Sequence, residues 1–92
     1  LEQATLIRRW RDELFSALET LPGIHPRPTD ANFIFFSCDF DADRVYRQLM
    51  EQGILIKNFN SPGTMQGCMR VTVGTREENQ AFLDVLRDII AK

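Results

Sequence analysis

The sequence has little of what several classes of protein need. It contains two cysteines, one histidine and no run of about 18–20 apolar residues of the kind that spans a bilayer. It also has no excess of positive charge, because 11 Lys and Arg are set against 13 Asp and Glu, a formal net charge of −2. A chain with this charge does not attract nucleic acid or an anionic membrane surface through its overall field. We therefore expect neither nucleic acid nor a membrane among its partners.

The two cysteines, Cys38 and Cys68, form no Cys-x-x-Cys pair. A structural zinc site needs about four Cys or His ligands, so a metal site is not expected. Nothing marks the chain as a secreted scaffold held by disulfides, and two reduced thiols in a cytoplasmic protein are favoured, although a single disulfide stays open as an alternative. Cys38 follows an apolar run, and we expect it to pack as a small hydrophobic residue.

Familiar catalytic sequences are missing as well. The chain has no Gly-x-Ser-x-Gly, His-Glu-x-x-His or P-loop sequence. The single histidine, His25, precedes a proline and is typical of a surface loop. Asp39, Asp41 and Asp43 stand in front of a predicted helix, and we interpret them as helix caps rather than catalytic carboxylates. We therefore predict no catalytic or metal-binding residue within the 92 residues.

What the sequence does contain is the pattern of one small domain. Apolar residues recur first at helical spacing, then as short runs, then again at helical spacing. The predicted order is helix, strand, helix, strand, strand, helix, over residues 6–21, 33–36, 41–53, 54–56, 69–73 and 75–90. This order predicts an α+β fold, a small and mostly antiparallel or mixed three-stranded sheet with helices packed mainly on one face.

Local signals mark the boundaries of these elements. Pro22-Gly23 ends the first helix, and Gly53 suits the position just after the second. Thr75 and Glu78 form a capping box for the third helix, in which each side chain can bond the other residue's N–H. The second helix is long enough to make a crossover between parallel or near-parallel strands at 33–36 and 54–56. The segment 58–68 between the last two strands is irregular, as functional loops often are.

The alternation in strand 69–73 separates an arginine from the core. Met69, Val71 and Val73 share one face, which we expect to meet the helices, and Arg70 points to the other. In a domain standing alone that second face would be wet. The run 33–36, Phe-Ile-Phe-Phe, is nevertheless apolar on both faces, as in a strand buried on both sides. The second face is therefore expected to lie against another domain or subunit.

Arg70 and Lys57 are the candidate binding residues. A charge inside an apolar strand is costly without a partner, and the arginine fork suits a carboxylate or phosphate. Lys57 ends the preceding predicted strand, at the mouth of the irregular loop, and can add a second cation. An exposed strand arginine paired with a nearby carboxylate is the structural alternative, and residue type alone favours that alternative.

The run from Gly67 to Asn79, Gly-Cys-Met-Arg-Val-Thr-Val-Gly-Thr-Arg-Glu-Glu-Asn, resembles the C-terminal signature of histidinol-phosphate aminotransferases. These are pyridoxal-phosphate enzymes of the fold-type I aminotransferase superfamily. Residues 30–36 and 53–58 are similar to further segments of the family in the same order and spacing, so the resemblance covers essentially the whole chain. It implies that residues 1–92 are the C-terminal small domain of such an enzyme, cut from a larger protein, and a first residue Leu1 in place of Met fits that expectation.

The resemblance also implies roles for the two cations. In the family, the arginine at the position of Arg70 binds the acidic group of the substrate, either the carboxylate of glutamate or the phosphate of histidinol phosphate. The basic residue at the position of Lys57 assists with the phosphate, although many relatives carry arginine there. The lysine that binds pyridoxal phosphate and the other cofactor residues belong to the large domain. The chain alone is therefore expected to bind no cofactor and to be inactive, and the parent to be a cytoplasmic homodimer of histidine biosynthesis.

Rival interpretations stay open. The small domain of a threonine-phosphate decarboxylase or of another class I/II aminotransferase would share these features, and only large-domain residues would separate them. A free-standing ferredoxin-like regulatory module that senses an amino acid or phosphate belongs to a different class, and it would present a polar second sheet face and its own start codon. An RNA-recognition domain is less well supported, because residues 33–36 lack the basic-Gly-aromatic lead-in.

Overall fold

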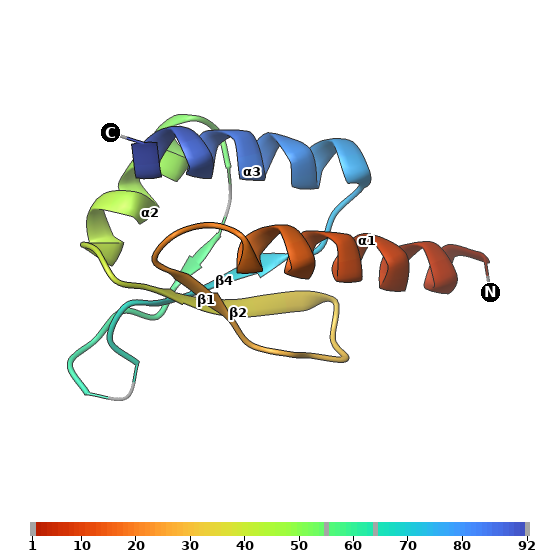
Figure 1. The fold of residues 1–92 in the computed structure, drawn as a ribbon, viewed down its shortest axis with the longest axis horizontal. Coiled ribbons are helices and arrows are strands. Elements are labelled where there is room, and N and C mark those ends of the chain that lie inside the picture. The colour runs from red at the N-terminus through yellow and green to blue at the C-terminus, as the bar shows by residue number, and fades with distance from the viewer. Residues whose placement is uncertain (1, 55, 64, 92) are drawn as a thin grey trace.

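The computed structural model describes residues 2–54, 56–63 and 65–91. The elements follow in the order α1 (Glu2–Glu19), β1 (Ile24–Pro26), β2 (Phe33–Cys38), α2 (Ala42–Glu51), β3 (Lys57–Asn58), β4 (Cys68–Thr72) and α3 (Arg76–Ala91). The three helices lie on one side of the sheet (Figure 1). The predicted α+β class and the order of the predicted helices and strands are confirmed. No helix within the described ranges has the length and apolar content to cross a membrane.

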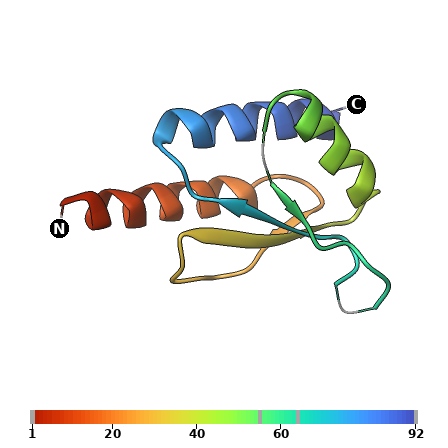
Figure 2. The same cartoon turned by 180° about the vertical axis from the view of Figure 1, so that it is seen from behind.

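The sheet has the strand order β1-β2-β4-β3, and each neighbouring pair is antiparallel. Because β2 and β3 both run antiparallel to β4, they run in the same direction, with β4 between them (Figure 2). The segment from β2 through α2 to β3 is therefore the helical crossover that the sequence predicts. Its two strands are parallel but do not hydrogen-bond to each other, because β4 occupies the place between them.

In the described residues the sheet has four strands rather than the predicted three, because β1 adds one at the edge. Ile24 pairs with Cys38 and Pro26 with Phe36. The predicted elements leave this proline-containing segment, between residues 21 and 33, unassigned. An edge strand needs an extended backbone, and proline, which lacks an N–H, is tolerated at an edge. The side chain of Ile24 is buried and anchors the strand to the core.

Strand β3 begins later than the predicted strand at 54–56. Among the described residues of this segment, Lys57 and Asn58 pair with β4, and Ile54 and Ile56 do not. The N–H of Ile54 still donates to the carbonyl of Leu49 in α2, at 2.9 Å, and the Ile54 side chain packs against the core. Leu55 lies outside the described residues. The apolar side chain of Ile54 therefore serves the core and not a strand.

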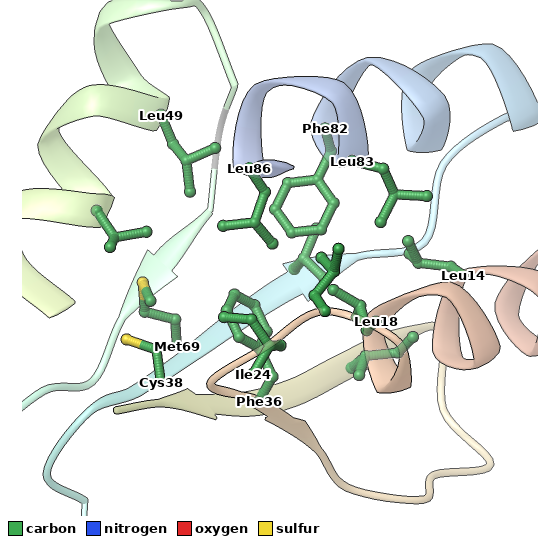
Figure 3. Packing of buried hydrophobic residues seen from close by; sticks show 14 of the residues in the cluster. Leu14, Leu18, Ile24, Phe36, Cys38, Leu49, Met69, Phe82, Leu83 and Leu86 are labelled. Atoms are coloured by element: carbon green, nitrogen blue, oxygen red, sulfur yellow. The ribbon is translucent and has the colours of Figure 1, made fainter. Parts of the chain in front are cut away.

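The core fills the space between the sheet and the helices. Leu14 and Leu18 of α1 and Phe82, Leu83 and Leu86 of α3 point toward Phe36 and Met69 on the sheet (Figure 3). Burying a side chain of this size contributes about 1.5–3 kcal/mol, so this layer supplies most of the stability. The largest side chains that are almost fully buried are Phe36, Leu14, Leu18, Ile34, Leu49, Met69, Leu86 and Val45.

Two predicted apolar stripes reach beyond the core. Leu6 and Ile7 in α1 are 38% and 40% exposed, and Met50 in α2 is 48% exposed. Figure 1 shows that the N-terminal turns of α1 project past the sheet, so no strand lies beneath them. Helical spacing predicts the stripe on a helix correctly, but how far a sheet extends beneath the helix is a tertiary property.

Of the three aspartates predicted as helix caps, Asp41 caps α2, whereas the side chains of Asp39 and Asp43 bond elsewhere. Oδ1 of Asp41 accepts the N–H groups of the first turn of α2, at 3.1 and 3.4 Å. Gly53 follows α2 with a φ of +81°, which favours glycine. In the capping box, the N–H of Glu78 donates to Oγ1 of Thr75 at 3.2 Å, and the N–H of Thr75 donates to Oε1 of Glu78 at 2.9 Å. These local bonds fix where α2 and α3 begin.

Candidate anion-binding site

Arg70 occupies the middle of β4, on the face of the sheet away from the helices. Its neighbours Met69 and Val71 point to the helices and are 0% and 4% exposed, so alternation turns Arg70 to the helix-free face. Pairing places it between Phe35 of β2 and Lys57 of β3. The face predicted for Arg70 is confirmed, and hydrogen-bonded strands on both sides hold its backbone.

The structure brings the two predicted cations together. Lys57 and Arg70 are directly paired across β3 and β4, where side chains on one face stand about 4.5–5.5 Å apart at Cβ. The ion pairs of the described residues involve neither cation. The alternative of a strand arginine neutralised by a neighbouring acid is therefore not what the described residues show. Two like charges side by side repel, and an anion placed between them would relieve that repulsion.

Two aromatic rings lie against the guanidinium of Arg70. Its Cζ lies 4.7 Å from the centroid of the Phe33 ring and 5.6 Å from that of Phe59. Phe35 joins the two rings, with centroid distances of 5.9 Å to Phe33 and 5.2 Å to Phe59. Such contacts are worth about 0.5–1 kcal/mol at exposed sites. Since none of the ion pairs of the described residues engages this guanidinium, its N–H donors are available for a ligand.

Phe59 is a part of the site that is not among the predicted binding residues. It belongs to the loop at 58–68. The Nζ atom of Lys57 also lies over its ring, 5.5 Å from the ring centroid. The sequence signal is its position two residues after Lys57, since alternate residues of an extended segment share a side. Thr64 of the same loop lies outside the described residues. Phe59 therefore contacts both cations.

Hydrogen bonds tie this loop to α2. The side-chain amides of Asn58 and Asn60 both donate to Oδ1 of Asp43, at 3.0 and 3.1 Å. These two bonds lower the pKa of the Asp43 carboxyl, because they stabilise its charged form. Asp43 does lie in the first turn of α2, as expected of a residue that interacts with the helix dipole, but its side chain serves the loop. This second role has no signal in the local sequence.

The loop closes through Gly67, where a glycine is required. The φ of Gly67 is +79°, and a Cβ atom there would lie 2.7 Å from the carbonyl oxygen of Cys38. The N–H of Gly67 donates to Oδ1 of Asn60 at 2.7 Å, and its carbonyl accepts the N–H of Cys38 at 3.0 Å. Gly67 therefore joins the loop to the end of β2.

The two cysteines are free and buried, and no disulfide links them. Cys68 is paired with Ser37, and the two side chains share one face of the sheet. Cys38 lies on the other face, toward the helices, as Phe36 does. The expected packing of Cys38 is confirmed. Burial raises the pKa of the Cys38 thiol, and a hydrogen bond to the carbonyl of Phe40 opposes this only in part. The thiol therefore stays protonated at neutral pH and is a poor nucleophile.

The remaining polar candidates form no further centre. His25 is exposed, as predicted, but it lies on the edge strand β1 rather than in a loop. Its Nε2 is 3.0 Å from the carboxylate of Asp39, which therefore pairs with His25 while Asp41 caps α2. Across the described ranges, no three His, Cys, Asp or Glu side chains gather as they would around a metal ion.

Comparisons with known proteins match the chain to one family. The family model for aminotransferase class I and II matches residues 2–86. The histidinol-phosphate aminotransferase 2 of Nitrosococcus oceani is 47% identical over 88 residues, which cover 94% of this chain and 24% of that protein. The histidinol-phosphate aminotransferase of Flavobacterium psychrophilum is 38% identical over 94 residues, covering 95% and 27%. The chain thus spans about a quarter of the length of these curated relatives.

Solved structures share the fold. The histidinol-phosphate aminotransferase of Clostridium acetobutylicum superposes with a TM-score of 0.84 at 20% identity, over 95% of this chain and 27% of that one. The L-threonine-O-3-phosphate decarboxylase of Porphyromonas gingivalis superposes with a TM-score of 0.80 at 23% identity, over 92% and 28%. At these identities the likeness concerns the fold alone.

Proposed function

Since this chain belongs to the aminotransferase class I and II family, we propose that residues 1–92 are the C-terminal small domain of a histidinol-phosphate aminotransferase. The parent enzyme transfers an amino group between histidinol phosphate and 2-oxoglutarate, depends on pyridoxal phosphate and is a cytoplasmic homodimer. The proposal is supported by the names of the relatives that are 38–47% identical and by the quarter of their length that this chain spans.

Within this proposal, Arg70 binds the anionic group of the substrate and Lys57 assists it. The observation that carries the assignment is the position of Arg70, on the helix-free face, beside a second cation and with no acid paired to it among the described residues. A planar guanidinium can donate two parallel hydrogen bonds to a carboxylate or to a phosphate. The same side chain can therefore serve both substrates, which carry different anions.

The described residues do not by themselves form a site for pyridoxal phosphate. The cofactor needs a lysine to form its Schiff base and an acidic partner for its ring nitrogen. Lys57 is the one lysine in the described ranges, and its Nζ lies over the Phe59 ring. Among the described residues, no acid is paired with Lys57 or with Arg70. The cofactor, which stabilises carbanions when bound, is therefore assigned to the large domain. The small domain, residues 1–92, supplies the anion site instead.

The helix-free face is also the surface on which we place the large domain. Phe33, Phe35 and Phe59 are only partly buried there, next to Arg70. A domain packed on this face covers the rings and excludes water from the anion site, which strengthens every charge interaction within it. A free-standing regulatory module was expected to show a polar second face, and the phenylalanines favour the enzyme over that module.

The test uses the intact protein that contains this chain. Amino transfer from histidinol phosphate to 2-oxoglutarate should be readily measured, and release of carbon dioxide from O-phosphothreonine should be absent. The reverse result would assign the domain to a threonine-phosphate decarboxylase, which shares the fold. Activity with neither substrate, but with another amino acid, would place the protein elsewhere in the family and overturn the proposed substrate.

A further inference from the structure

One carboxylate oxygen of α2 holds the segment that carries Lys57 and Phe59. Oδ1 of Asp43 accepts a hydrogen bond from Nδ2 of Asn58 at 3.0 Å and another from Nδ2 of Asn60 at 3.1 Å. The two asparagines are the residues on either side of Phe59. Asp43 therefore holds the backbone on both sides of this ring.

Alternation explains why the tether and the site do not compete for space. In an extended segment successive side chains point to opposite sides. Asn58 and Asn60 turn toward α2, whereas Lys57 and Phe59 turn toward Arg70 on the helix-free face. Fixing the two asparagines therefore fixes the direction of Lys57 and Phe59 without any direct contact with them.

The tether extends into the loop itself. Oδ1 of Asn58 accepts the N–H of Asn60 at 2.9 Å, and Oδ1 of Asn60 accepts the N–H of Gly67 at 2.7 Å. Asp43 is itself held, because its N–H donates to Oδ1 of Asp41, the cap of α2, at 3.1 Å. Every hydrogen-bonding side-chain atom of the two asparagines is thus engaged in one connected network.

The two cations differ in their need for this network. Arg70 lies in β4, with paired strands on both sides. Lys57 lies in β3, a two-residue strand at the edge of the sheet, and Phe59 lies in the loop just beyond it. Strand pairing alone holds the first cation, whereas so short a strand holds the second only weakly. The second cation therefore depends on what restrains residues 58–60.

We propose that Asp43 is a positioning residue of the anion site, which holds Asn58 and Asn60 so that Phe59 and Lys57 lie beside Arg70. The inference rests on the proposed function and deepens it, because it names a remote residue that sets the affinity for the same anionic group. Asp43 itself touches no substrate. It acts from α2, on the other side of the segment.

The experiment compares three variants of the intact protein. Asp43→Ala removes the acceptor oxygen, and Asp43→Asn keeps an oxygen that can accept both amide bonds while losing the charge. Asp84→Ala is the matched control, since Asp84 is also an exposed helical carboxylate that accepts a side-chain amide, from Gln80 at 2.8 Å. KM and kcat with histidinol phosphate are measured for each, and hydrogen exchange of the peptide spanning 57–67 reports on the tether.

We expect Asp43→Ala to raise KM about 5-fold with kcat within about twofold of wild type, because binding weakens while the chemistry is untouched. Asp43→Asn should fall between Asp43→Ala and wild type, because its oxygen still accepts the two amide bonds but without the charge that strengthens them. Asp84→Ala should stay near wild type. Adding Asp43→Ala to Lys57→Gln should raise KM less than the product of the single effects, because both changes act on the same cation. Faster hydrogen exchange in Asp43→Ala with an unchanged KM would overturn the inference, and so would equal effects of Asp43→Ala and Asp43→Asn.

Failure of the proposed function would be recognised separately. If the wild-type protein does not turn over histidinol phosphate, the substrate assignment fails whatever the variants do. The positioning inference is then judged on the affinity for inorganic phosphate, measured by calorimetry on the same intact proteins. Asp43→Ala should weaken that affinity about 5-fold, and an unchanged affinity would overturn it.

Discussion

The two faces of the sheet use the same kinds of residue for different purposes. On the face toward the helices, Ile34, Phe36 and Met69 are at most 1% exposed and belong to the core. On the other face, Phe33 and Phe35 are partly exposed; the Phe33 ring lies against the guanidinium of Arg70, and the Phe35 ring contacts that of Phe33. Phenylalanine contributes burial on the first face and orients a cation on the second. A phenylalanine in a strand therefore reveals its role only when its face is known.

The two cations make a second contrast, within the helix-free face. Arg70 stands on an inner strand and Lys57 on the edge strand, opposite each other. Backbone pairing on both sides positions the first, and a side-chain tether from α2 supports the second. An inner strand provides rigidity through the sheet itself, whereas an edge strand of two residues needs help from another element.

The largest effect should separate the two faces at adjacent positions of β2. Phe36→Ala should destabilise the chain by about 3–5 kcal/mol, because it leaves a cavity in the core. Phe35→Ala, on the helix-free face, should cost about 1 kcal/mol or less, since its ring is partly exposed already. Urea unfolding of both variants measures the two free energies. Equal losses would show that this face is as important for stability as the core.

The next effect concerns Arg70 and should appear in activity, not in stability. Arg70→Gln should lower kcat/KM of the intact enzyme about 100-fold, because the charged fork for the substrate anion is lost. Its free energy of unfolding should change by no more than about 0.5 kcal/mol. Arg70→Lys keeps the charge without the fork and should fall between wild type and Arg70→Gln. A fully active Arg70→Gln variant would remove Arg70 from the binding site.

A smaller effect is expected at Lys57, the cation on the edge strand. Lys57→Gln should raise KM for the phosphate-bearing substrate about 5- to 10-fold, because charge at this position is what assists binding. Lys57→Arg keeps the charge, so its KM should stay near the wild-type value. Steady-state kinetics at several salt concentrations measure the difference, which should shrink as salt screens the charge. A loss as large as that of Arg70→Gln would contradict the contrast between the two cations.

The smallest effect is the acid dependence of the tether. The hydrogen bonds from Asn58 and Asn60 lower the pKa of Asp43, so its charged form is favoured in the folded chain. The stability from these bonds is present above the ordinary carboxyl pKa of 3.8 and is lost as the pH falls through the depressed value. The side-chain amide resonances of both asparagines should therefore stay constant down to about pH 5 and shift only below 3.8. A shift centred near neutral pH would contradict this.

Much of the fold follows from local sequence. Pro22-Gly23, Gly53 and the Thr75-Glu78 capping box mark helix boundaries, because each acts on backbone within a few residues. Strand pairing is less accessible. The predicted strand at 54–56 and the unpredicted β1 both show that apolar or extended segments become strands only where a partner strand lies alongside.

Some residues of the candidate site can likewise be predicted from the local sequence, and others cannot. Arg70 and Lys57 can be selected from the sequence because of their charge and their place in or beside apolar strands. Phe59 and Asp43 cannot be selected in that way, because neither is unusual among its own neighbours. Their importance arises from contacts with segments distant in sequence.

The alternation of side chains along β4 is enough to place Arg70 on the other face of the sheet from Met69 and Val71, since alternation is a property of the backbone of one strand. Helix ends and the separation of core from surface residues also come from such near neighbours. Only the tertiary structure decided that Lys57 lies beside Arg70, and that Asp43 reaches Asn58 and Asn60, 15 and 17 residues away. Those contacts depend on how a crossover helix packs back onto a sheet, which no local pattern encodes.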